Sequence, residues 1–159
     1  MTDPQPPDIA IRILVDADAC PVKDEIYRVA ARHRVFVYIV SNSPFRVPVS
    51  PSVHRIVVSN SFDAADDWIA EQSDARCIVI TSDILLADRA IKAGAEVLAP
   101  TGKPFTAASI GSAIATRAIM ADLRAGVSDV SGGPAPFSKS DRSQFLQALD
   151  QILVKLARR

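Results

Sequence analysis

The chain has 159 residues, 48% hydrophobic and 23% charged, which are the proportions of an ordinary globular domain. Its 18 basic and 18 acidic residues balance to a formal net charge of zero, so no overall field attracts nucleic acid or a membrane surface. Any nucleic acid would have to be held by a local basic patch or through bound metal.

Residues 1–8 are polar and proline-rich and lack the basic-then-apolar pattern of a signal peptide. We expect them to form a disordered leader before a single domain at residues 9–159. The two cysteines are too few for a disulfide scaffold, and Cys20 and Cys77 are predicted at opposite edges of the sheet, where they cannot pair. No apolar run has membrane-spanning length. These features favour a cytoplasmic protein.

Short apolar runs alternate with helical patterns along the chain, which favours an α/β fold with a parallel sheet and crossover helices. In chain order, the expected elements are a strand at 9–15, a helix from 21, strands at 35–40 and 55–58, a helix at 62–72, a strand at 77–81, a helix at 83–92, a strand at 95–98, and helices at 106–124 and 140–157. Prolines exclude regular structure from much of residues 41–53, and Gly94 is a suitable helix end. Residues 126–136 are expected to be a flexible connection.

Aspartates gather where the predicted strands end. Asp16 and Asp18 follow the first strand, Asp63 and Asp66 begin the helix after the third, and Asp83 follows the fourth. Ligand sites of open parallel sheets lie beyond the carboxyl ends of the strands. Because carboxylate oxygens suit Mg²⁺ or Mn²⁺, and such ions support phosphodiester hydrolysis, this pattern predicts a metal-dependent site.

Helical spacing predicts that the acidic residues of the helix at 62–72 point in different directions. Asp63 and Asp66 share one face at i, i+3, whereas Asp67 points about 100° away. We therefore expect Asp63 and Asp66 to face the site. The alternative for each aspartate is a helix cap, since aspartate is favoured in the first turn. Capping needs only one carboxylate per helix, and a repelling cluster is hard to explain without a cation.

The chain contains several uncommon sequence strings in order along its length. They are residues 16–21 (DADACP), 46–48 (RVP), 62–66 (FDAAD), 81–87 (TSDILLA), 92–95 (KAGA), 132–134 (GGP), and 141–142 (DR) with Phe145. Together they resemble the YaiI/YqxD family of uncharacterised bacterial proteins, and the resemblance covers nearly the whole chain from the first strand onward. Ser61 and Leu85 stand where the family strings commonly have glycine and proline, which affects local loop geometry and removes no carboxylate.

That family looks like a branch of the PIN-like fold, whose better-known members are metal-dependent ribonucleases. The resemblance implies a three-layer sandwich with a central five-stranded parallel sheet in the order 3-2-1-4-5. It also implies Asp16, Asp66 and Asp83 as the catalytic, metal-binding set, with Asp18 and Asp63 as further metal ligands.

Three arginines are candidates for binding substrate phosphate: Arg46 in the proline-rich loop, Arg117 on the helix at 106–124, and Arg142 near the start of the last helix. Solvated or ion-paired surface arginines are the alternative for each. Lys103, in a Pro-Thr-Gly-Lys-Pro string, lacks the glycine spacing of a phosphate loop and is interpreted as part of a turn.

Other site chemistries are less well supported. Cys20 precedes a helix, but neither His33 nor His54 is placed to serve it as a base, so a cysteine hydrolase is not expected. Too few cysteines and histidines remain for a zinc site.

The sequence thus predicts a Mg²⁺- or Mn²⁺-dependent nuclease acting on RNA or another nucleic acid. The main alternative is a non-catalytic module that binds a nucleotide, an RNA or a protein, which neutral charge favours. A phosphohydrolase acting on small molecules is the third possibility.

Overall fold

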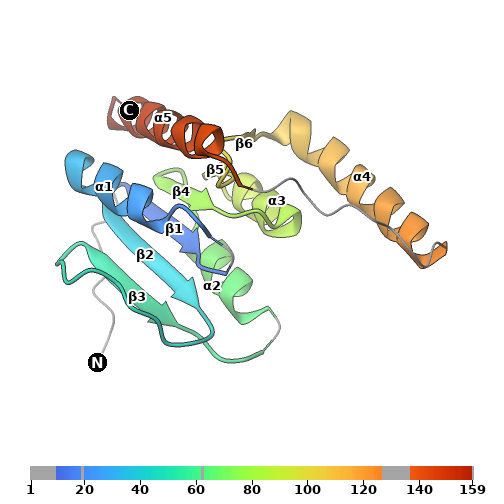
Figure 1. The fold of residues 1–159 in the computed structure, drawn as a ribbon, viewed down its shortest axis with the longest axis horizontal. Coiled ribbons are helices and arrows are strands. Elements are labelled where there is room, and N and C mark those ends of the chain that lie inside the picture. Colours follow the sequence, from blue (N-terminus) through green and yellow to red (C-terminus); the bar gives the residue numbers. More distant parts are fainter. Residues whose placement is uncertain (1–9, 19, 62, 127–136, 159) are drawn as a thin grey trace.

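The computed structural model describes residues 10–18, 20–61, 63–126 and 137–158 (Figure 1). The predicted leader, and the predicted connection at 126–136 except for its first residue, lie outside these ranges. The strands are β1 (Arg12–Asp16), β2 (Phe36–Ser41), β3 (Val53–Val57), β4 (Cys77–Ile80), β5 (Glu96–Leu98) and β6 (Pro104–Phe105). The helices are α1 (Lys23–His33), α2 (Ala64–Gln72), α3 (Ile84–Lys92), α4 (Ala107–Gly126) and α5 (Lys139–Ala157).

The sheet has the order β3-β2-β1-β4-β5-β6. The first five strands pair in parallel, as predicted, and the order 3-2-1-4-5 is confirmed. β6 was not predicted, because the Pro-Thr-Gly-Lys-Pro string indicated only a turn. That turn brings two residues back antiparallel to β5 at the sheet edge, where a proline is tolerated because its missing N–H faces no partner strand.

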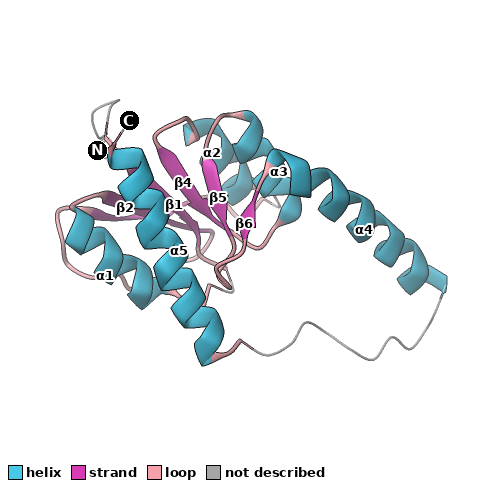
Figure 2. Ribbon diagram, turned by 90° about the horizontal axis from the view of Figure 1, so that it is seen from above, coloured by secondary structure: helices cyan, strands magenta, loops and turns pink. Residues whose placement is uncertain are grey.

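Helices cover both faces of the sheet, which makes three layers (Figures 1 and 2). On one face, α1 and α5 contribute buried residues such as Ile26, Phe145 and Leu149 to one hydrophobic cluster. On the other face, α2, α3 and the first turn of α4 contribute Ile69, Leu86 and Ile110 to a second cluster. β1 and β4 lie in the middle with apolar side chains buried on both faces, as central parallel strands require.

The predicted element boundaries differ from the structure by up to three residues. β1 begins at Arg12, three residues after the expected start, and this is the first residue whose Cα has partners on both neighbouring strands, Phe36 and Cys77. α4 reaches Gly126 and projects from the layered body beyond α3 (Figure 2). Among the described residues, no helix combines the length and the apolarity needed to cross a membrane.

Gly94 ends α3 as predicted, with a φ of +96° in the left-handed region that favours glycine. Cys20 and Cys77 are both free thiols, in agreement with their predicted separation.

Gly102 allows α5 to pack closely on the turn between β5 and β6. Its φ is +88°, and a Cβ there would lie 2.6 Å from the backbone carbonyl carbon of Gln144 and from the amide nitrogen of Phe145. We expect Gly102→Ala to lower the free energy of unfolding by more than about 1 kcal/mol, because both backbone strain and this contact oppose it. Urea denaturation measures the effect.

Gly111→Ala is the matched control. Gly111 lies within α4, and beyond its own helical backbone no atom lies within 4 Å of the position that a Cβ would take, so alanine should stabilise the helix by up to about 1 kcal/mol. Equal unfolding free energies for the two variants would contradict the close packing of α5 on the turn.

Candidate active site at the strand ends

The carboxyl ends of β1 and β4 meet at the point where the strand order reverses. From β1 the chain passes outward to β2 and β3, then returns to form β4 on the opposite side of β1. Asp16 is the last residue of β1, and Asp83 lies three residues beyond the end of β4. In open parallel sheets, this reversal is the usual position of a ligand site.

All five predicted aspartates line one pocket of about 490 Å³ at this edge. Asp16 and Asp18 come from the end of β1, Asp63 and Asp66 from the start of α2, and Asp83 from the start of α3. Segments up to 67 residues apart in sequence thus bring five carboxylates to a common cavity.

A buried threonine connects the two central strand ends. Thr81 is 2% exposed, and its hydroxyl donates to the Asp16 carboxylate at 3.0 Å. The same oxygen accepts a 3.0 Å hydrogen bond from the backbone N–H of Asp83. Thr81 therefore holds the end of β1 and the start of α3 at a set separation. Its hydroxyl position was not singled out from the sequence, although it lies in the TSDILLA string.

Thr81→Val is expected to lower the free energy of unfolding by about 1–3 kcal/mol, because it removes the donor to a partly buried carboxylate and the acceptor for a backbone N–H. Thr81→Ser keeps the hydroxyl and should lose clearly less. Chemical denaturation at neutral pH compares the two, and an equal loss in both would assign the effect to the missing methyl contacts instead of the hydrogen bonds.

Helix capping accounts for only one of the five carboxylates. Asp83 is the N-cap of α3 and accepts hydrogen bonds from the backbone N–H groups of Leu85 and Leu86 at 2.9 and 3.2 Å. Asp63 is the N-cap residue of α2 but makes no side-chain capping hydrogen bond. The N-cap position of α1 is Val22, so neither Asp16 nor Asp18 caps that helix.

Burial and mutual repulsion raise the pKa of two pocket carboxyl groups. Burial is the main cause that raises the pKa of Asp66 to about 6, and the neighbouring carboxylates of Asp83, Asp16 and Asp63 add to it. Burial also raises the pKa of Asp16 above its ordinary value, although the Thr81 hydrogen bond partly opposes this. The ionised forms of both carboxyl groups are therefore disfavoured in the pocket, and a bound cation would offset that cost.

The neighbouring acidic residues have other partners. Asp67 forms an ion pair with Arg89 at 2.9 Å and does not line the pocket, as its predicted direction on α2 implied. Asp88 pairs with Lys92 one turn further along α3, also at 2.9 Å.

Of the three candidate phosphate-binding arginines, the structure brings only Arg117 to the pocket. Arg46 is exposed in the loop between β2 and β3 and does not line it. Arg142 does not line it either, since its guanidinium donates to Glu25 and to the Pro21 carbonyl at 2.9 Å and lies over the Phe137 ring. Arg142 thereby connects α5 to the start of α1.

Asn42 also lines the pocket and was missed from the sequence. It follows β2 directly, so the strand-end argument that selected the aspartates applies equally to it. Its amide oxygen is a further candidate ligand for a hard cation.

The pocket offers oxygen donors without a closed metal cage. In the parts of the chain that the structure describes, no three His, Cys, Asp or Glu side chains already stand together as a metal site. Mg²⁺ and Mn²⁺ suit such a pocket nevertheless, since Mg²⁺ commonly uses one or two carboxylates and completes its shell with water and substrate oxygens. The donor types and the raised pKa of Asp66 fit a hydrated divalent ion.

The cysteine and histidine side chains do not form an alternative site. Burial raises the pKa of the Cys20 thiol, which opposes a reactive thiolate. His33 bonds to Asp150 on α5 at 2.7 Å, and His54 lies against the Phe36 and Tyr38 rings at the β3 edge.

The fold and the pocket together define a three-layer α/β protein with a carboxylate-lined cavity at its topological switch point. Residues 14–155 match the family model described as "Uncharacterized BCR, YaiI/YqxD family". The chain belongs to this family, which confirms the resemblance found in its sequence.

Close relatives share nearly the full length of the chain. A UPF0178 protein of Sphingopyxis alaskensis is 70% identical over 146 residues, which are 92% of this chain and 95% of that protein. A UPF0178 protein of Rhodopseudomonas palustris strain BisB5 is 55% identical over 159 residues, 100% of this chain and 94% of the relative. No solved structure matches the chain.

Proposed function

We propose that this protein is a divalent-metal-dependent nuclease of PIN-like type that hydrolyses phosphodiester bonds, with RNA as its substrate. The observation that carries the proposal is the convergence of five aspartates on one cavity at the switch point of the sheet. Only one of them caps a helix through its side chain, so capping does not explain the cluster. The raised pKa of Asp66 supports a cation as the missing partner.

Each residue has a distinct role in this proposal. Asp16, Asp66 and Asp83 would hold Mg²⁺ or Mn²⁺, and Asp18 and Asp63 would assist directly or through water. The ion would supply Lewis-acid chemistry at the substrate phosphate. Thr81 orients the Asp16 carboxylate through its 3.0 Å hydrogen bond. Arg117, the predicted phosphate-binding residue that lines the pocket, neutralises a phosphate that would otherwise be repelled by the aspartates.

Cleavage of a labelled single-stranded RNA in the presence of Mn²⁺ or Mg²⁺ tests the proposal. We expect cleavage that EDTA abolishes and that Asp16→Asn slows by about a hundredfold or more, since even outer-shell changes at metal sites cost about 10–100-fold. Asp88→Asn is the matched control: it removes a carboxylate outside the pocket and should retain the wild-type rate.

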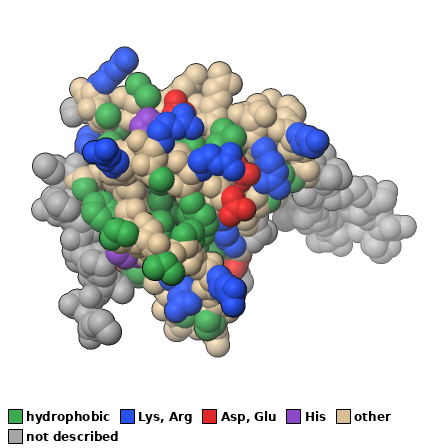
Figure 3. Space-filling view, turned by 60° about the vertical axis from the view of Figure 1, so that its left-hand side comes forward, with side chains coloured by type: hydrophobic (Ala, Val, Ile, Leu, Met, Phe, Trp, Pro, Cys, Tyr) green, Lys and Arg blue, Asp and Glu red, His purple; other side chains and the backbone are tan. Residues whose placement is uncertain are grey.

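A non-catalytic binding module is the second candidate. The net charge is zero, and on the face drawn in Figure 3 the lysine and arginine side chains are scattered, with acidic groups among them, instead of forming one stripe. RNA or nucleotide binding that Asp16→Asn leaves unchanged, without cleavage under any metal condition, would decide for this module. Turnover of phosphate monoesters alone would instead indicate a phosphohydrolase of small molecules.

A further inference from the structure

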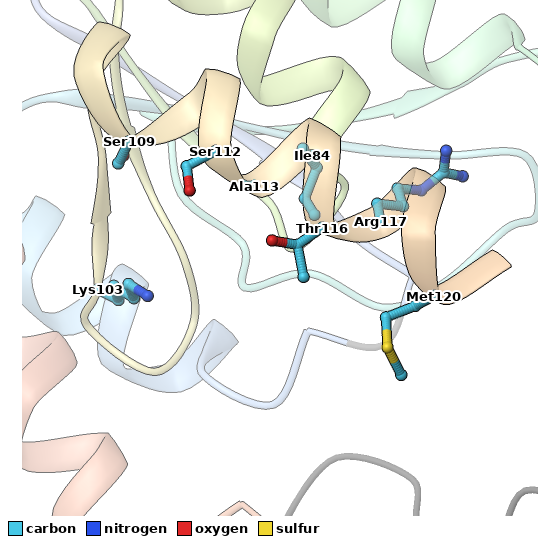
Figure 4. Close-up of a pocket in the computed structure, with 8 residues that line it drawn as sticks. All are labelled: Ile84, Lys103, Ser109, Ser112, Ala113, Thr116, Arg117 and Met120. Atoms are coloured by element: carbon cyan, nitrogen blue, oxygen red, sulfur yellow. The ribbon is translucent and has the colours of Figure 1, made fainter. Parts of the chain in front are cut away.

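A second cavity of about 800 Å³ lies between α4 and the turn that joins β5 to β6. We call it the α4 groove and define it by Lys103, Ser109, Ser112, Thr116 and Arg117. Figure 4 shows Ser109, Ser112 and Thr116 along α4, with Lys103 across the cavity on the turn. Lys103 therefore lies in a turn, as predicted from the sequence, and the fold places this turn opposite α4.

The side chains of the α4 groove suit phosphate groups. Ser109, Ser112 and Thr116 are spaced i, i+3 and i+7, which places them on one helical face. The Ser109 hydroxyl accepts from the Thr106 backbone N–H at 2.9 Å and donates to the Thr106 carbonyl at 3.3 Å, so Ser112 and Thr116 supply the hydroxyls for a ligand. Lys103 adds a positive charge, and Arg117 lies at the end of the groove with its guanidinium pointing away from Lys103 in Figure 4. The lining also includes the apolar residues Ile84, Ala113 and Met120 and no carboxylate. Hydroxyl, ammonium and guanidinium groups are the side-chain donors that proteins use for nucleic-acid backbones.

The α4 groove adjoins the acidic pocket. Arg117 lines both cavities, and the first turn of α3 separates them, with Ile84 on the groove and Asp83 on the pocket. From Ser109 to Thr116 the groove follows seven residues of helix, about 10 Å at roughly 1.5 Å per residue. That length exceeds one phosphate group, so the groove has room for more than one phosphate of a nucleic-acid backbone.

We propose that the α4 groove binds the phosphate backbone of single-stranded nucleic acid on one side of the bond to be cleaved. The inference rests on the proposed nuclease function and adds the direction from which the substrate enters, along α4 and past Arg117. The lining residues include no aromatic ring, so bases are not stacked there and recognition has little sequence preference. A duplex would need phosphate contacts over a wider surface than this groove provides.

Fluorescence anisotropy with labelled single-stranded RNA, measured in EDTA so that no metal-dependent cleavage occurs, tests the groove. A twelve-nucleotide strand should bind more tightly than a three-nucleotide strand. Lys103→Ala combined with Thr116→Ala should weaken binding of the longer strand by about tenfold, because hydrogen bonds to charged phosphates are lost. Lys103→Ala alone should reduce the salt dependence of binding by about 0.7 in the log–log slope, which loss of a phosphate contact predicts and a change of structure does not.

Lys139→Ala combined with Ser140→Ala is the control, since both residues are exposed at the start of α5 and line neither cavity. The inference is overturned if the groove variants bind the longer strand as the wild type does, or if a duplex binds more tightly than the single strand.

Hydrolysis of bis(p-nitrophenyl) phosphate by the wild type and Asp83→Asn, with Mn²⁺, tests the acidic pocket separately. Hydrolysis that needs Asp83, with unchanged RNA binding in the groove variants, would leave the nuclease proposal standing and refute the groove. Absence of hydrolysis, with RNA binding lost in the groove variants, would refute the nuclease proposal and support the groove as a binding site.

Discussion

Asp66→Asn is expected to raise the melting temperature of the metal-free protein at neutral pH while removing its response to Mn²⁺. Asparagine keeps the size of the side chain and removes the charge that burial and three neighbouring carboxylates disfavour. The expected rise is a few °C, since about 1 kcal/mol corresponds to about 2–4 °C for a domain of this size.

The pH dependence of this effect follows from the raised pKa. Folded Asp66 has a pKa of about 6, above the ordinary value of 3.8, so between these values the folded state binds more protons than the unfolded state. Wild-type stability therefore falls as pH rises from about 4 to 6, and the deficit is complete above about 6. The advantage of Asp66→Asn should be complete above about pH 6, decrease between about pH 6 and 4, and vanish below about pH 4.

In saturating Mn²⁺, the wild type should have a higher melting temperature than Asp66→Asn. An ion that binds only the folded state contributes about 2.7 kcal/mol at roughly one hundred times its dissociation constant, or roughly 5–10 °C for the wild type. Asp66→Asn should show little of this increase. Asp88→Asn is the control: it removes an ion pair with Lys92 outside the pocket, should lose at most about 1 kcal/mol, and should keep the full Mn²⁺ response.

Two results would argue against the site. A lower melting temperature for Asp66→Asn without metal would mean that its carboxylate stabilises the helix instead of opposing its neighbours. An equal Mn²⁺ response in all three proteins would mean that the ion binds elsewhere.

Phe145→Ala is expected to lower the free energy of unfolding by about 3–5 kcal/mol, the range for a buried phenylalanine replaced by alanine. Phe145 is 0% exposed and packs with α1 and the sheet in the first hydrophobic cluster. Urea denaturation measures the loss. Gln147→Ala, two residues along the same helix at an exposed position, should change stability by less than about 0.5 kcal/mol.

Phe145→Ala also tests whether the stability of the core affects the Mn²⁺ response of the acidic pocket. α5 contributes no side chain to the acidic pocket, so folded Phe145→Ala should keep the Mn²⁺-dependent stabilisation. A small loss of stability, close to that of Gln147→Ala, would contradict the packing of α5 against the sheet.

Local patterns in the sequence predicted most of the secondary structure. Apolar runs indicated the five parallel strands, and Gly94 indicated the end of α3. The i, i+3 spacing correctly predicted that Asp63 and Asp66 face the pocket and that Asp67 points elsewhere, because the geometry of one helix fixes which of its side chains share a face. These features depend on residues close together in the chain.

The strand order followed from the family resemblance and not from any local pattern, since several orders satisfy the same alternation of strands and helices. β6 was missed because two residues after a proline-containing turn carry no strand signal of their own. Asn42 was not predicted because the site prediction rested on carboxylates, whereas Asn42 carries an amide at an equivalent strand end.

The sequence by itself determined the types of elements, the residues at each strand end, and the acidic character of that edge. Only the tertiary structure decided that Arg117 reaches the pocket while Arg46 and Arg142 do not, and that Thr81 bridges β1 and α3. The physical reason is that these relations join segments tens of residues apart. Their distances depend on how helices pack across the sheet, and neither periodicity nor spacing along the chain contains that information.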